Sequence, residues 1–153
     1  MRDCSLLPLY FLATVPTMPL VSRKGILAIA AVIDIAINAR NRPVSAKALA
    51  ARHKLPPRHL EPVLQALVHD GILRGIRGPH GGYELAREHR DVTAEDILRA
   101  ARTAEEAGDP PLPSSVLVTD IVHPALAEAE RLFSAALGRI NVEELSSQAD
   151  ATK

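Results

Sequence analysis

A short segment rich in glycine and proline, Arg77–Gly82, restricts the fold of this chain more than any other feature. The runs on either side, Ile72–Ile76 and Tyr83–Ala86, are short and carry β-branched, aliphatic or aromatic residues. Two such runs around a glycine-containing loop are typical of a β-hairpin. Because the remaining patterns are helical, the sequence predicts one small hairpin on a mainly α protein.

Three helices are expected before the hairpin and one after it. The first is Ser22–Arg40, with isoleucines at three- and four-residue spacing, and the second is Ala46–His53, capped by Ser45. The third ends just before Gly71, which has the position of a helix C-terminal glycine. Thr93 is expected to cap the fourth. The apolar face of the third helix carries Leu60, Val63, Leu64 and Leu67.

The C-terminal part of the chain predicts a loop, two helices and a tail. Residues 104–123 contain the run GDPPLPSS, which cannot form a regular helix, and are expected to be a linker. A longer helix should start near Pro124, and a short one capped by Asn141 should end near Leu145. Residues 146–153 are expected to be a flexible tail.

Residues 1–17 match nothing that follows them. Their apolar stretch would allow a secretory signal, but Asp3 cancels the charge of Arg2 and no clear cleavage site follows. A disordered extension, or a translation start at Met18, is therefore the expectation.

The net charge of zero hides an uneven distribution of charge. Residues 19–90 hold twelve Lys or Arg and five Asp or Glu, whereas residues 91–153 hold five and twelve. The pattern predicts a module that binds a polyanion, followed by a part that does not. Chance clustering of charges on solvated faces is the alternative.

The composition and motifs argue against several classes of protein. The single cysteine, Cys4, excludes a disulfide within the chain and a metal or iron–sulfur site held by several thiolates of one chain. The histidine spacings match no common zinc site. No phosphate loop or activated nucleophile is found, so no enzyme is predicted. No apolar run approaches the roughly 20 residues of a membrane span.

The predicted order of helices, hairpin and helix is typical of a winged helix-turn-helix, here over residues 18–103. In that fold the third helix enters the major groove of DNA, and the hairpin, or wing, reaches along the backbone. Helix N-termini suit phosphates, glycines let the backbone approach closely, and arginine suits the minor groove. Winged helices that bind proteins are the alternative.

Local motifs resemble the Rrf2 family of bacterial transcription regulators. The match includes VSRKG at residues 21–25, AVIDIA at 31–36, the wing DGILRGIRGPHGGY at 70–83 and VTAEDIL at 92–98. It runs from Met18 to about Leu145.

The resemblance implies a homodimer that binds double-stranded DNA at a pseudo-palindromic operator, with dimerisation helices over residues 124–145. Glu61 would accept a hydrogen bond from a cytosine amino group, and Lys24 is the best candidate for a phosphate contact. Ordinary structural roles are the alternatives: Glu61 could balance Arg58 or His69, Tyr83 could pack beneath the wing, and the glycines could serve the turn. The candidate DNA-binding residues are Lys24, Arg58, His59, Glu61, Arg77, Gly78, His80, Gly81, Gly82 and Tyr83. The candidate dimer-interface residues are Leu126, Ala129, Leu132, Phe133, Ala136 and Leu137.

The chain departs from the family pattern in two places. Members that sense iron–sulfur status or iron place three cysteines in the loop that corresponds to residues 103–123, and this chain has none there. A member without a metal cluster or other cofactor is therefore expected. Pro62 lies inside the third helix and is expected to kink that helix or delay its start.

The leading hypothesis is a cytoplasmic, homodimeric, sequence-specific transcription regulator that acts as a repressor and has no membrane partner. One alternative is a winged-helix module that binds proteins without reading DNA. Another is a regulator that binds a small molecule between the dimer helices and the DNA-binding head, with residues 108–115 lining the site.

Overall fold

The computed structural model describes residues 20–106 and 115–152. The expectations for residues 1–17 and for residues 108–114 therefore lie outside the described residues. In chain order the elements are α1 (Arg23–Asn38), α2 (Ala46–Arg52), α3 (Pro57–His69), β1 (Leu73–Ile76), β2 (Gly82–Leu85), the 3₁₀ turn η2 (His89–Asp91), α4 (Ala94–Glu106), the π-helical segment η3 (Leu117–Val122), α5 (His123–Leu137) and α6 (Val142–Ala151).

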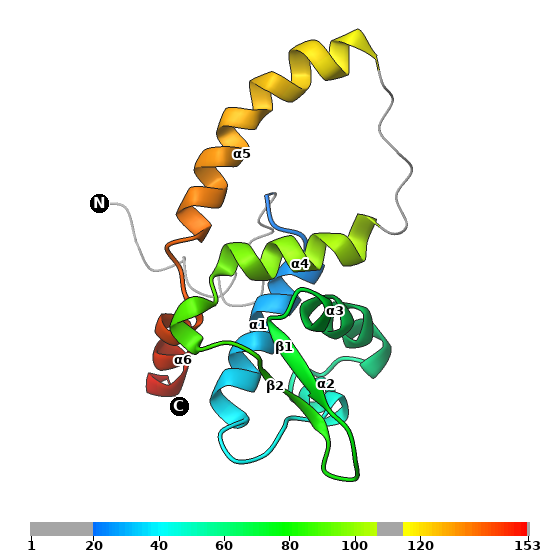
Figure 1. The fold of residues 1–153 in the computed structure, drawn as a ribbon, viewed down its shortest axis with the longest axis vertical. Helices are drawn as coiled ribbons and strands as arrows, with labels where there is room; N and C mark the ends of the chain where they lie inside the picture. The colour runs from blue at the N-terminus through cyan, green and yellow to red at the C-terminus, as the bar shows by residue number, and fades with distance from the viewer. Residues whose placement is uncertain (1–19, 107–114, 153) are drawn as a thin grey trace, which may run out of the picture.

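A helical head is formed by α1 to α4 together with the hairpin and α6, and α5 extends beyond it (Figure 1). Helix α1 packs against α4 and α6, and α3 packs against α4. The mainly α winged-helix prediction is confirmed. Among the residues described, no helix has the length and apolarity that crossing a bilayer requires.

The core of the head is aliphatic. The predicted inner face of α3 is confirmed, because Leu60, Val63, Leu64 and Leu67 are all fully buried. Ile35 of α1, Leu49 of α2 and Ile97 of α4 meet them in one cluster. With few aromatic residues, the helices pack through leucine, isoleucine, valine and alanine.

Side-chain caps set the helix starts where the sequence places them. The Oγ of Ser22 accepts a hydrogen bond from Gly25 N at 3.0 Å, and the Oγ of Ser45 accepts one from Ala48 N at 3.1 Å. At α6 the Oδ1 of Asn141 accepts from Glu144 N at 2.9 Å. These bonds satisfy backbone donors that have no partner inside the helix.

Helix α3 ends at the predicted glycine. Gly71 has φ +71°, a conformation that glycine adopts without strain. Its N–H donates to Val68 O at 3.0 Å, and the N–H of Ile72 donates to Leu67 O at 2.9 Å. This pair of bonds is a Schellman motif, and it turns the chain directly into β1.

The two strands of the wing are antiparallel, with Leu73 opposite Leu85 and Ile76 opposite Gly82. The predicted hairpin is confirmed: β1 starts one residue later than predicted and ends at the predicted Ile76, and β2 lies one residue earlier than predicted. A further bridge joins Tyr83 to Val44, which precedes α2, through N–H to O bonds of 2.8 and 2.9 Å. The base of the wing is therefore tied to the start of α2.

Pro62 does not delay the start of α3, so that part of the expectation is wrong. The helix begins at Pro57, directly after Pro56, and continues through Pro62. Pro62 cannot donate to the carbonyl of Arg58 one turn earlier. Both residues are exposed, so water can satisfy that carbonyl.

The predicted linker over residues 104–123 is wrong where the structure describes it. Helix α4 continues to Glu106, and η3 is helical before Pro124. In a π-helical turn each N–H bonds one residue further back than in an α-helix. Val122 has helical backbone angles, so η3 continues directly into α5.

The flexible tail expected at 146–153 is also wrong as far as residue 152. Helix α6 continues to Ala151, Val142 and Ser146 are buried, and Arg40 of the α1–α2 loop pairs with Asp150 at 3.0 Å. The N–H of Ala94 donates to Ile140 O at 2.8 Å, which holds this turn on the start of α4. Helix α6 is therefore part of the head, not an extension of α5.

Replacing Gly82 with alanine should destabilise the head by about 1–3 kcal/mol, because an added methyl group would meet the backbone of Val44. Gly75 lies in the same hairpin, and a methyl group there would meet nothing within 4 Å. Urea unfolding of Gly82→Ala and Gly75→Ala compares the two directly. Equal unfolding free energies would contradict the close packing of the wing against Val44.

Candidate nucleic-acid interface

The structure brings three of the candidate residues into one groove. Lys24 at the start of α1 lies beside Arg58 and His59 at the start of α3. Arg23 and His53 also line this groove, so its rim is rich in cationic and titratable side chains. Lys24 is exposed, with its Nζ at 3.4 Å from Ala104 O. Such a rim can contact several phosphates of a polyanion.

The exposed face of α3 lies opposite its buried leucine and valine face. Arg58, Glu61, Pro62 and Gln65 are exposed and recur at three- and four-residue spacing. Within the described part of the chain Glu61 has no ion pair, so the structure does not support its balancing Arg58 or His69. Sequence reasoning missed Gln65, although its helical spacing from Glu61 was the signal that could have found it.

The tip of the wing presents the candidate residues Arg77, Gly78 and His80 to solvent. Gly78 has φ +118°, which a residue with a side chain rarely adopts. The tip is therefore shaped by a glycine, and the Arg77 side chain has no partner among the described residues.

The remaining candidates in the wing, Gly81, Gly82 and Tyr83, have structural roles that explain why these residue types occur there. An added methyl group at Gly81 would meet the carbonyl of Ile76 across the turn, and at Gly82 it would meet Val44. Tyr83 is half-buried and packs against the core. These three residues hold the wing in place, and a contact between them and DNA stays a prediction.

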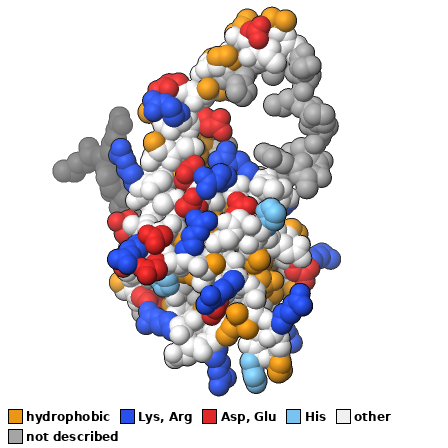
Figure 2. Space-filling model, viewed as in Figure 1, with side chains coloured by type: hydrophobic (Ala, Val, Ile, Leu, Met, Phe, Trp, Pro, Cys, Tyr) orange, Lys and Arg blue, Asp and Glu red, His pale blue; other side chains and the backbone are white. Residues whose placement is uncertain are grey.

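A second groove lies between the tip of the wing and the start of α2. His80 and Gly81 line one side, and Arg42 and Arg52 line the other. Sequence reasoning did not single out Arg42, and only the charge surplus of residues 19–90 pointed to it. In Figure 2, Lys and Arg side chains and a histidine lie at the lower end of the head, whereas acidic side chains are more numerous higher up on this face.

A largely buried carboxylate holds the turn that leads into α3. Asp34 of α1 has a side chain only 11% exposed, and its Oδ2 accepts from Arg52 Nε at 2.9 Å. His53 Nε2 is 3.2 Å from the same oxygen, although it is not aligned for a hydrogen bond. Asn38 Nδ2 donates to the other oxygen at 3.0 Å. The cluster therefore ties the end of α2 to α1.

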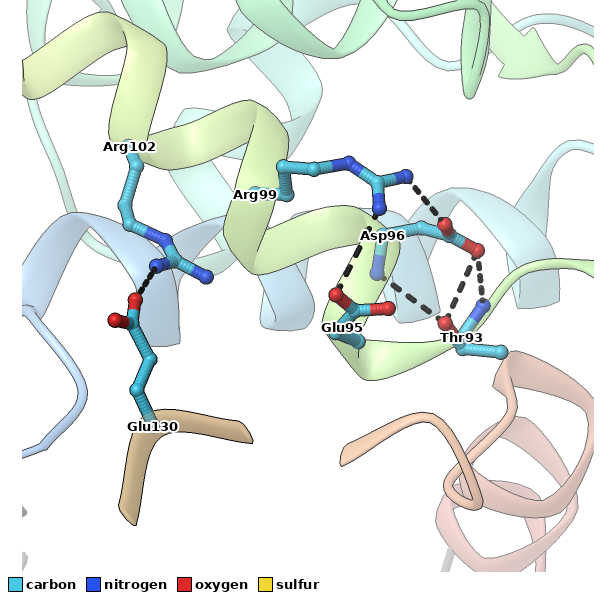
Figure 3. Close-up of polar contacts among 6 residues, drawn as sticks. All are labelled: Thr93, Glu95, Asp96, Arg99, Arg102 and Glu130. Carbon is cyan, nitrogen blue, oxygen red and sulfur yellow. Dashed lines mark hydrogen bonds and ion pairs between the residues drawn. The ribbon is translucent and has the colours of Figure 1, made fainter. Parts of the chain in front are cut away.

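Helix α4 begins with a reciprocal cap, shown in Figure 3. The N–H of Thr93 donates to Asp96 Oδ2 at 3.2 Å, and the N–H of Asp96 donates to Thr93 Oγ1 at the same distance. Burial raises the pKa of the Asp96 carboxyl, but the bonds from Thr93 and the nearby Arg99 outweigh it and hold that pKa below its usual range. The carboxylate stays charged and stabilises the positive end of α4.

The six candidate dimer residues do not share one face of α5. Leu126, Ala129 and Phe133 line a cavity between α5 and the head. Leu132 is 57% exposed, and Ala136, one turn further along, is exposed as well. Leu137 is half-buried. Helix α5 and η3 therefore present a second apolar surface to solvent, which also includes Leu117 and Ile121.

Comparisons with known proteins agree with this architecture. A model of the Rrf2 family, described as iron-dependent transcriptional regulator, matches residues 21–148. The chain therefore belongs to the Rrf2 family, and the resemblance seen in the sequence is confirmed. It is similar to the HTH-type transcriptional regulator CymR of Bacillus subtilis, with 34% identity over 79 residues, 52% of this chain and 57% of CymR. It is also similar to the protein rrf2 of Nitratidesulfovibrio vulgaris, with 33% identity over 73 residues, 48% of this chain and 49% of that protein.

Two solved structures extend the likeness over most of the chain. The structure of T. potens IscR has 28% identity and a TM-score of 0.66, and the match covers 87% of this chain and 90% of IscR. The structure of B. subtilis CymR, described as the global cysteine regulator, has 26% identity and a TM-score of 0.62, with 84% and 96% covered. By sequence, the chain spans about half the length of the relatives that it matches.

The residues of this chain do not fit the iron that the family description names. Cys4 is the single thiol of the sequence, too few for a cluster held by thiolates of one chain. Over residues 20–106 and 115–152, no three His, Cys, Asp or Glu side chains gather in a way that could hold a metal ion. We therefore derive no function through iron.

Replacing Asp34 with alanine should lower the free energy of unfolding by about 1–3 kcal/mol, because Arg52 and His53 would lose their buried partner. Urea unfolding measures the change. Glu128→Gln, which breaks the solvent-exposed pair of Glu128 with Arg131, is the control and should have a much smaller effect. An equally small effect of Asp34→Ala would show that the cluster does not hold the α2–α3 turn.

Proposed function

We propose that this chain is a homodimeric transcription regulator that binds double-stranded DNA at a pseudo-palindromic operator and represses transcription without a metal cluster. The single observation that carries the proposal is the placement of Lys24, Arg58 and His59 in one groove beside the exposed face of α3. A wing with an exposed arginine lies on the same head. The names of the relatives, which are transcriptional regulators, support the same function.

In this proposal phosphates supply affinity and α3 supplies specificity. Lys24, Arg58 and Arg77 contact the backbone or the minor groove, which makes binding dependent on salt. Glu61 accepts from a cytosine amino group, and Gln65 suits the paired donor and acceptor of an adenine. The ring of Pro62, between them, suits a thymine methyl group. The cytoplasm is the expected location, because the operator of such a regulator lies there.

The surface of α5 supports a homodimer. Leu117, Ile121 and Leu132 are each more than half exposed and lie outside the lining of the cavity between α5 and the head. A long helix with this many exposed apolar side chains favours pairing with a second copy, which would remove them from water. A dimer also places two heads side by side, as a pseudo-palindromic operator requires.

The first experiment compares binding to the DNA upstream of the protein's own gene with binding to random DNA of equal length, at several salt concentrations. Preference for the upstream DNA, with log K falling steeply as log salt rises, is the expected result. Random-site selection would identify an operator elsewhere. Failure of a folded dimer to bind any DNA would reject the proposal and favour the protein-interaction alternative.

Replacing Arg77 with alanine should weaken binding to the operator by about 1–3 kcal/mol, because the wing would lose its cation in the groove. Arg90→Ala is a matched control, since it removes one positive charge from an exposed site on η2 that pairs with Glu88. Fluorescence anisotropy with labelled DNA measures both affinities. Similar affinities for the two variants would contradict the role of the wing.

Introducing aspartate at Leu132 should convert the dimer to a monomer, because two charges would be buried at the seam between the α5 helices. Val68→Asp, at an exposed apolar site on α3, is the control and should remain dimeric. Analytical ultracentrifugation gives the mass of each variant. A dimeric Leu132→Asp protein would place the interface elsewhere.

A further inference from the structure

A cavity of about 500 Å³ lies between the head and α5, which is within the size range of small-molecule sites. Leu20 and Val21 before α1 and Leu98 of α4 form its floor, and Leu126, Ala129 and Phe133 of α5 form its opposite wall. The lining is therefore apolar on both sides. One charged pair interrupts it, Arg102 of α4 and Glu130 of α5.

The Arg102–Glu130 pair joins α4 of the head to α5 through one N–O contact. Nη1 of Arg102 is 3.2 Å from Oε1 of Glu130, with side chains 45% and 63% exposed. Arg99, one turn earlier on α4, has both of its carboxylate partners, Glu95 and Asp96, on its own helix (Figure 3). Arg102 reaches across to α5 and, with the described residues, makes one of the five N–H bonds that a guanidinium can make.

We propose that this cavity binds a small organic anion, a carboxylate with a compact apolar body. The carboxylate pairs with the guanidinium of Arg102 through two parallel bonds, in place of the single bond to Glu130. Glu130 turns outward, where its exposure allows water to solvate it. The apolar body packs on Leu98, Leu126 and Phe133.

The placement of the ligand would couple it to the arrangement of the head and α5. When the anion binds, Arg102 pairs with it and the contact between α4 and α5 is lost. The head and α5 are therefore held together differently with and without the anion. If α5 forms the dimer, this changes how the two heads are held, a consequence that rests on the proposed function. Binding of the anion itself does not depend on DNA.

The test is a fluorescence titration of the full-length protein, without DNA, with 8-anilinonaphthalene-1-sulfonate. This probe has an apolar body and one anionic group. We expect saturable binding of one probe per chain, displaced by 4-phenylbutyrate and much more weakly by its uncharged amide. Equal displacement by the acid and the amide would overturn the assignment of an anion site.

Substitutions at Arg102 and Glu130 test the proposed role of the charged pair most directly. Arg102→Gln should lower the affinity for the probe by about tenfold or more, since a charge-assisted bond is lost. Glu130→Gln should raise this affinity, because the competing carboxylate is removed. Arg99→Gln, on the same helix but outside the cavity, should change the affinity by no more than about twofold. An unchanged affinity in Arg102→Gln, or equal losses in Arg102→Gln and Arg99→Gln, would overturn the proposal.

A variant that fills the cavity separates this site from other apolar surfaces. Ala129→Trp should abolish probe binding while the protein keeps its melting temperature and oligomeric state. If Ala129→Trp changes the oligomeric state, Ser134→Trp, from the same lining, replaces it. Full binding by the cavity-filling variant, or no binding by the folded wild-type dimer, would overturn the proposal.

The same samples distinguish this proposal from the proposed function. DNA affinity is measured with and without saturating 4-phenylbutyrate. If the protein binds no DNA under any condition, the proposed function is rejected. The ligand titrations still test the anion site, because they are done without DNA.

Discussion

The close approach of helices to α1 is the constraint on which the rest of the head depends. Gly25 faces Leu98 of α4 so closely that a methyl group there would collide with it. Further along, Ala28, Ala31 and Ala36 are buried and present only methyl groups to neighbouring helices. Since α4 and α6 both pack against α1, small side chains let one helix serve as the support for the others.

That support gives the outward side chains their positions. Leu60 and Leu64 hold α3 in the core, which directs Arg58, Glu61 and Gln65 outward. The Asp34 cluster fixes the turn before α3, and the bridge between Val44 and Tyr83 fixes the base of the wing. The surface that we propose for DNA is therefore carried on rigid elements, which is what recognition of a regular duplex requires.

Helix α5 has a different relation to the core. One of its faces contacts the head across an apolar cavity and, among the described residues, one ion pair, and another face is exposed. A weak link of this kind can take two arrangements at a small difference in free energy. The family's usual association with iron has no matching donor set in the described residues, and the cavity offers a different chemistry for a signal.

Local features of the sequence determined much of this protein. Ser22, Ser45 and Asn141 cap the predicted helices, and Gly71 ends α3, because capping needs only neighbouring residues. The glycine-rich hairpin and the buried face of α3 follow in the same way from short-range spacing.

Only the tertiary structure decided the placement of α6, whose helix is held by contacts with Val92 and Arg40 far away in the chain. It also brought Lys24 to Arg58 and separated the two apolar faces of α5. These outcomes depend on which helices pack together, because distant residues meet only through the packed core.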